Sequence, residues 1–142
     1  MKGCAKRLLV IGLLAAPAQA ALPALEPGLW EVLVETTTAP DPNKYPTERF
    51  RRCLKPDETA DPRKLLPTSV NREACRVTSL KEDGARVLYS IVCDKNKLTA
   101  SGDFSFTATA YRGTIVTELL EVSSNRLQIL QQVTAKRAGP CP

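Results

Sequence analysis

The sequence predicts a mostly β domain: an antiparallel meander of about seven strands that forms a curled sheet or a small barrel, with one short helix. Apolar and polar side chains alternate with a period of two through most of the chain. Turn residues such as Asp83-Gly84 and Ser123-Ser124-Asn125 separate these runs at short intervals. Short turns need no long crossover, which favours a curled meander over the alternative, a β-sandwich.

The elements follow from the alternation and from the residues that interrupt it. We expect strands over residues 28–38, 48–54, 75–80, 86–93, 97–110, 114–122 and 126–136. A turn is predicted at 111–113, and Gly102 is expected to mark a bend or bulge within its strand. Asp61 as a cap and Pro62 in the first turn predict a helical turn over 61–65.

The first twenty residues have the layout of an export signal and are set apart from the fold. Lys2, Lys6 and Arg7 precede an apolar run over 8–16, and Ala18-Gln19-Ala20 is typical of a cleavage site. The apolar run is far shorter than the roughly 20 residues that a membrane-spanning helix needs. We therefore expect 1–20 to be removed, no membrane span in the mature chain, and one domain over 21–142.

The charge of the mature chain is nearly balanced. Without the three signal cations, 17 Lys plus Arg stand against 15 Asp plus Glu, which leaves +2. This small excess argues against a nucleic-acid partner, since such domains are strongly basic. Arg49, Arg51 and Arg52 form a local cluster, which we interpret as the solvated edge of a sheet.

Four cysteines of the mature chain predict two disulfides, since their number is even and the chain is expected to be exported. Three connectivities are possible. Symmetry about the turn at Gly84 sets Cys75 opposite Cys93, which leaves Cys53 to pair with Cys141. The cysteine spacings are wide and the chain has no histidine, so we predict no metal site and no cofactor.

Several segments occur together in the order typical of one protein family. They are PGLWEV (27–32), CLKP (53–56), ADPRKLLP (60–67), Cys75, LYSIVC (88–93), SGDFSFTATAYRGTI (101–115) and AKRAGPC (135–141). The chain thereby resembles the exported bacterial family catalogued as domain of unknown function 3617. The resemblance implies an exported, periplasmic or secreted, mostly β protein with paired cysteines, and it implies no particular activity.

The sequence shows no catalytic constellation, so no catalytic residue is predicted. Glu31 and Glu35 would lie about 14 Å apart on one strand face at ~3.4 Å per residue, too far apart to act as a pair. Trp30, Tyr89, Phe104 and Phe106 could line a ligand pocket, although such residues more often form plain core.

The leading hypothesis is a non-enzymatic exported protein that binds a small apolar or amphipathic ligand, or a partner in the cell envelope. Two alternatives stay open. One is a structural envelope protein, and the other is an enzyme whose carboxylates and arginines meet only in the folded chain.

Overall fold

The structure is a computed structural model that describes residues 21–119 and 127–142. The expected signal, residues 1–20, and the expected turn at 123–125 lie outside the described residues. Seven strands form the main sheet: β1 (Gly28–Ala39), β2 (Glu48–Leu54), β5 (Arg76–Asp83), β6 (Arg86–Cys93), β7 (Leu98–Phe106), β8 (Ala110–Leu119) and β9 (Gln128–Gly139). Two short strands, β3 (Ser69–Val70) and β4 (Glu73–Ala74), pair only with each other.

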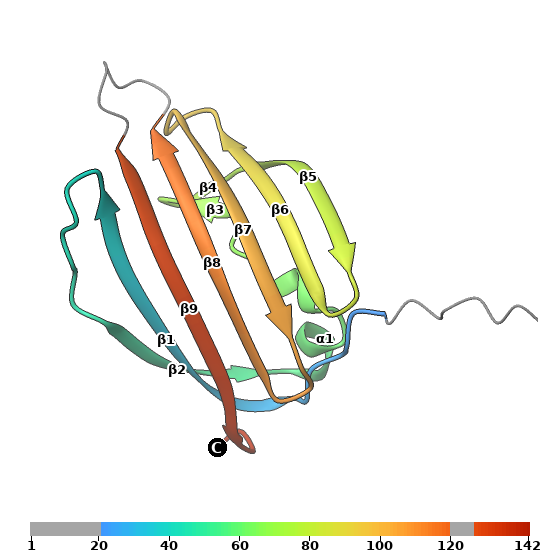
Figure 1. Cartoon of the computed structure of the whole chain (residues 1–142). Helices are drawn as coiled ribbons and strands as arrows, with labels where there is room; N and C mark the ends of the chain where they lie inside the picture. Colours follow the sequence, from blue (N-terminus) through green and yellow to red (C-terminus); the bar gives the residue numbers. More distant parts are fainter. Residues whose placement is uncertain (1–20, 120–126) are drawn as a thin grey trace, which may run out of the picture.

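The seven strands form one open antiparallel sheet in the order β2-β1-β9-β8-β7-β6-β5 (Figure 1). The predicted curled meander is confirmed for β5 to β9, and β1 then joins the meander beside β9. Closure into a barrel is wrong, because the edge strands β2 and β5 do not pair with each other. The sandwich alternative is also wrong, because the second sheet has only β3 and β4.

A crossover segment, residues 55–75, connects the two edges of the sheet and carries its helical turns. It contains α1 (Pro56–Thr59), the 3₁₀ turn η1 (Pro62–Leu65), β3 and β4. The predicted turn over 61–65 is confirmed as η1, where the Asp61 carboxylate accepts a hydrogen bond from the Arg63 backbone N–H at 3.1 Å. The crossover lies over one face of the sheet (Figure 1), which we call the inner face.

The core lies between the inner face and the crossover. Leu54 at the end of β2 and Leu66 of the crossover are 2% and 6% exposed, and they belong to the same buried cluster as the inner residues of the sheet. Because the crossover fills the side on which the sheet curls, it supplies the apolar cover that barrel closure would otherwise provide.

Both predicted disulfides are present, Cys53–Cys141 and Cys75–Cys93. The predicted pairing of Cys75 with Cys93 is correct, although the observed register differs from the predicted one by two shifts that cancel. The turn is Gly84-Ala85 with Asp83 opposite Arg86, which alone would move Cys75 out of register with Cys93. A bulge at Thr78, between Val77 and Ser79, restores the register. The Cα atoms of Cys75 and Cys93 then lie 4.5 Å apart.

The second half of the meander differs from the prediction at one turn and one glycine. β7 ends at Phe106 and β8 begins at Ala110, so residues 111–113 lie in a strand and not in a turn. The alternation continues past Phe106 in the sequence, so periodicity alone could not locate the turn. The bulge expected at Gly102 is also wrong, since its register with Tyr89 and with Ile115 is continuous.

Candidate ligand-binding face

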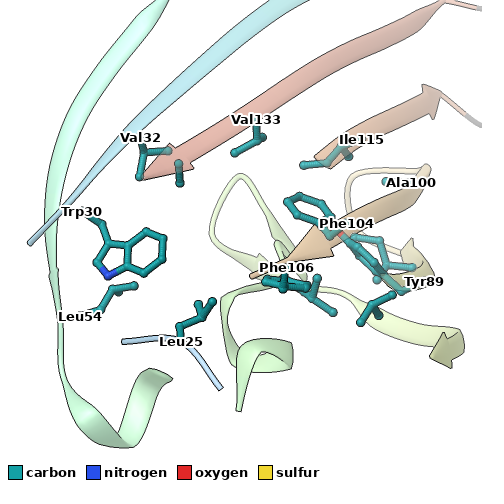
Figure 2. Close-up of a cluster of buried hydrophobic side chains, with 14 of the residues drawn as sticks. Leu25, Trp30, Val32, Leu54, Tyr89, Ala100, Phe104, Phe106, Ile115 and Val133 are labelled. Carbon is teal, nitrogen blue, oxygen red and sulfur yellow. The ribbon is translucent and has the colours of Figure 1, made fainter. Parts of the chain in front are cut away.

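Five aromatic side chains form a continuous row across the inner face. In spatial order they are Trp30, Tyr111, Phe106, Phe104 and Tyr89, with successive ring centroids 5.6, 5.8, 6.3 and 6.2 Å apart. The four that the sequence singled out are at most 3% exposed, and Figure 2 shows them within the buried cluster. Stacked and tilted rings at these separations attract one another beyond the gain from burial.

Sequence reasoning missed Tyr111, which links Trp30 to Phe106. It was placed in a turn, whereas the structure places it near the start of β8 on the inner face. A signal existed in the sequence. Counting back by twos from Ile115, a β-branched residue in a clear strand, sets Gly113 and Tyr111 on the same face.

The polar ends of two rings in the row are bound by backbone carbonyls. The Trp30 indole N–H donates to the Glu26 oxygen at 3.1 Å, and the Tyr89 hydroxyl donates to the Pro67 oxygen at 2.9 Å. Burial raises the pKa of Tyr89 to about 12, because the charged phenolate would lose its hydration. Tyr89 is therefore neutral at physiological pH and is held by the crossover.

Two glycines allow the aromatic row to lie flat on the sheet. A Cβ on Gly102 would lie 2.1 Å from a Tyr89 ring carbon, and a Cβ on Gly113 would lie 2.4 Å from a Phe104 ring carbon. Each glycine is the cross-strand partner of the ring that covers it. Gly102 therefore provides space for a ring and does not mark a bulge.

The cover of the inner face is uneven. Every inner residue of β6 and β7 is buried, from Val87 to Cys93 and from Leu98 to Phe106. On β1, by contrast, Trp30 and Val32 are buried whereas the next inner residues are only half-buried. β9 and β8 change in the same way beyond Val133 and Ile115. The crossover thus covers one part of the inner face and leaves another part partly accessible.

We call the partly accessible part the open inner region. Its residues are Val34, Thr36, Thr117, Leu119, Ile129 and Gln131. Backbone pairing sets Thr36 opposite Gln131 on one side of β9, and Thr117 opposite Ile129 on the other. The region carries methyl groups, hydroxyls and one amide but no charged side chain. This mixture suits an uncharged molecule with an apolar part.

The carboxylates considered from the sequence lie on the opposite, outer face. Glu31 accepts a hydrogen bond from Arg51 at 2.6 Å, and its side chain is 53% exposed. Glu35 is exposed on the same outer face of β1, with Leu33 between it and Glu31. The third arginine of the local cluster, Arg52, points to the inner side and binds Glu58 at 2.7 Å. β2 is an edge strand, as the solvated-edge interpretation expects.

A second acid–base pair on the outer face joins Arg86 and Asp103. The guanidinium Nε lies 2.7 Å from the carboxylate, and this hydrogen bond holds the pKa of Asp103 below its ordinary value. A lowered pKa makes Asp103 a weaker proton acceptor at neutral pH. The exposed, ion-paired carboxylates thus favour a structural role over acid–base chemistry.

Two further properties concern only the part of the chain that the structure describes. Within 21–119 and 127–142, no three His, Cys, Asp or Glu side chains gather in a way that could hold a metal ion. No helix there has the length and hydropathy needed to cross a membrane.

Comparison with known proteins identifies the family. The model of the family described as "Protein of unknown function (DUF3617)" matches residues 25–141. The chain belongs to this family. The match begins just before β1, ends at Cys141, and so includes the whole sheet and both disulfides. No curated protein and no solved structure matches the chain.

Proposed function

We propose that this DUF3617 domain is an exported, non-enzymatic protein that binds a small uncharged amphipathic molecule at the open inner region. The observation that carries the proposal is the loss of cover along three neighbouring strands. Beyond Val32 on β1, Val133 on β9 and Ile115 on β8, the inner residues at this end of the sheet are half-buried. The inner residues of β6 and β7 stay buried along their whole length.

The chemistry of the region supports a ligand with an apolar chain and a neutral polar group. Val34, Leu119 and Ile129 present methyl groups, and an apolar ligand chain lying across them would remove their remaining surface from water. Gln131 lies opposite Thr36 in the same region and offers an amide donor and acceptor for the polar group. A charged ligand would have no counter-ion among these residues.

Export is supported by the signal-like residues 1–20 and by the two disulfides. Paired cysteines persist in oxidising compartments and are rare in the reducing cytosol. We place the protein in the periplasm or outside the cell. Detection of the mature N-terminus at Ala21, by mass spectrometry of the protein from the exported fraction, would test this placement.

Ligand binding is best tested with a neutral probe and a pair of variants on one strand. Thr117→Lys puts a charge in the open inner region, whereas Thr114→Lys puts the same charge on the outer face of β8. We expect a medium-chain monoacylglycerol, below its critical micelle concentration, to shift the methyl resonances of Val34 and Ile129. Thr117→Lys should weaken this binding at least about tenfold, which corresponds to about 1.4 kcal/mol.

The matched variant Thr114→Lys should bind the monoacylglycerol as the wild type does. Shifts confined to outer-face residues, or equal losses in the two variants, would contradict the proposal. Such a result would favour the structural alternative, in which the inner face has no ligand.

A further inference from the structure

A groove of about 560 Å³ lies on the outer face of β2, β1 and β9 and does not belong to the proposed ligand site. Its side chains are Glu31, Leu33, Arg49, Arg51, Thr134 and Lys136. These residues alternate with the buried inner residues Trp30, Val32 and Ala135, so they point away from the core. We call this feature the outer basic groove.

The register of the sheet gathers cations from three separate strands around this groove. In one row, Arg49 lies opposite Leu33, Leu33 opposite Thr134, and Thr134 opposite Arg112 of β8. In the next row, Arg51 lies opposite Glu31, and Glu31 opposite Lys136. Because neighbouring strands are about 4.8 Å apart, Arg51 and Lys136 lie within about 10 Å of each other across β1.

The positive charge of the groove is only partly neutralised. Arg51 is bound to Glu31 at 2.6 Å, and within the described part of the chain Glu31 is the sole carboxylate that lines the groove. Among the described residues, Arg49, Arg112 and Lys136 have no acidic partner within 4 Å, whereas Arg52 and Arg86 each have one and Arg63 has two. Three cations therefore line the groove with one carboxylate, and a fourth, Arg112, lies opposite the lining residue Thr134.

We propose that the outer basic groove binds a phosphate group, carried either by a small phosphate compound or by the headgroup of an anionic phospholipid. Guanidinium groups match phosphate oxygens with paired N–H donors, and Arg49 and Arg51 line the groove. Arg112 lies next to it, opposite the lining residue Thr134. The Thr134 hydroxyl supplies a neutral donor between Leu33 and Arg112. The groove is open to solvent, so binding should weaken as the salt concentration rises.

The experiment uses the full mature chain, with inorganic phosphate and phospholipid vesicles as probes. The test variant, Arg49→Gln/Lys136→Gln, removes two unpaired cations of the groove. The control, Arg76→Gln/Lys81→Gln, removes two exposed cations from β5 at the far edge of the sheet and changes the net charge equally. We expect the test variant to bind at least about tenfold more weakly than the wild type, and the control to stay within about twofold.

The two probes distinguish the source of the phosphate. Shifts of the Arg49 and Arg112 side-chain resonances with inorganic phosphate indicate a small phosphate compound. Co-sedimentation with phosphatidylglycerol vesicles, but not with phosphatidylcholine vesicles, indicates a lipid headgroup. Either result supports the proposal if the test variant alone loses it.

Absence of binding to both probes would overturn the proposal. An equal loss in the test and control variants would also overturn it, since net charge and not the groove would then be responsible. Binding of the neutral monoacylglycerol serves as a separate readout. It depends on the open inner region alone and should be unchanged in the Arg49→Gln/Lys136→Gln variant, so failure here leaves the proposed function intact.

Discussion

The inner face of the sheet has a covered side and an open side that are built from similar strands. On β7 apolar inner residues alternate with polar outer ones, and on both β6 and β7 every inner residue is buried. β1 and β9 also place most of their apolar residues on the inner face, yet Val34, Ile129 and Gln131 there are only half-buried. The strand pattern therefore determines which face turns inward, whereas the crossover determines how far that face is removed from water.

The crossover is held over the covered side by several independent contacts. The disulfide from Cys75 joins it to Cys93, and the Tyr89 hydroxyl donates to the Pro67 carbonyl. The Glu73 carboxylate accepts backbone N–H bonds from Lys95 and Asn96, at 2.9 and 3.0 Å, in the turn between β6 and β7. On the side of β1 and β2, Arg52 binds Glu58 of the crossover, and Cys53–Cys141 ties β2 to the end of the chain across β1.

Removing the two disulfides separately should give the largest effects and should test whether the cover or the loop length matters more. Cys53→Ala/Cys141→Ala opens an 88-residue loop, and Cys75→Ala/Cys93→Ala opens an 18-residue loop. By loop-closure entropy we expect losses of about 4.6 and about 3 kcal/mol in the free energy of unfolding. Urea denaturation followed by Trp30 fluorescence measures both.

The order of these two losses is the informative result. If removal of Cys75–Cys93 lowers the free energy of unfolding by more, this disulfide stabilises the fold chiefly by holding the crossover on the covered side. Loop closure would then be the smaller part of its contribution. The m-value serves as a control, because a variant that loses its cover in the native state should expose less new surface on unfolding.

A pair of substitutions on neighbouring strands compares directly how much the covered side and the open side contribute to stability. Gly102→Ala would place a methyl group 2.1 Å from a carbon of the Tyr89 ring on the covered side. The hydrogen bond to Pro67 of the crossover prevents this ring from moving away. We expect a loss of about 1–3 kcal/mol. Thr117→Val on the open side should change the free energy of unfolding by no more than about 0.5 kcal/mol. Thermal denaturation at matched concentration compares them, and equal losses would contradict a difference in cover.

The strands and their inward faces could be predicted because they depend on local alternation. The staple of the β5–β6 hairpin was also predicted, although the turn at Gly84-Ala85 and the bulge at Thr78 each shift the register by one. No local signal marks the bulge: Thr78 is an ordinary strand residue whose hydroxyl donates to the Ser90 carbonyl at 3.3 Å. The Cys75–Cys93 pair was therefore predicted correctly, although the predicted register of the β5–β6 hairpin is wrong by one residue at the turn.

Features that depend on which strands become neighbours could not be predicted. β1 pairs with β9 because the two ends of the domain meet, and only this pairing brings Lys136 beside Glu31 and Arg51. In the sequence Arg49 and Arg51 looked like an isolated edge cluster. Likewise Gly102 looked like a bend, since the ring that covers it belongs to Tyr89 on another strand.

A smaller effect is expected from Tyr89→Phe, which removes one hydrogen bond between the covered side and the crossover. The Pro67 carbonyl would lose its donor, and we expect a loss of about 1 kcal/mol in the free energy of unfolding. Phe104→Leu, within the same row, is a suitable control because it changes packing without touching this bond. Loss of amide protection confined to residues near Pro67, in hydrogen exchange, would identify the lost bond as the cause.

The buried Tyr89 hydroxyl predicts that the stability of the fold depends on pH in the alkaline range. The pKa of Tyr89 is about 12 in the folded chain and about 10 in an unfolded one, because burial disfavours the phenolate. The folded state therefore holds a proton that the unfolded state releases, and stability should fall as the pH rises from about 10 to 12. Burial also raises the pKa of Tyr111, so Tyr89→Phe should reduce this fall without abolishing it. An unchanged pH dependence in the variant would contradict the assignment.

The smallest expected effect is local and concerns the contact of the β3–β4 hairpin with the turn after β6. Hydrogen bonds from the Lys95 and Asn96 backbone hold the pKa of Glu73 below its ordinary value. A lowered pKa means that the contact is fully formed above the ordinary glutamate range and weakens as the pH falls through the lowered value. Glu73→Gln keeps the shape but removes the charge, so the Lys95 and Asn96 amides should exchange faster near neutral pH while global unfolding hardly changes. Glu48→Gln on the opposite edge strand is the control. If neither amide responds to Glu73→Gln or to acid, the Cys75–Cys93 disulfide and the Tyr89 hydrogen bond hold the crossover on the covered side without this contact.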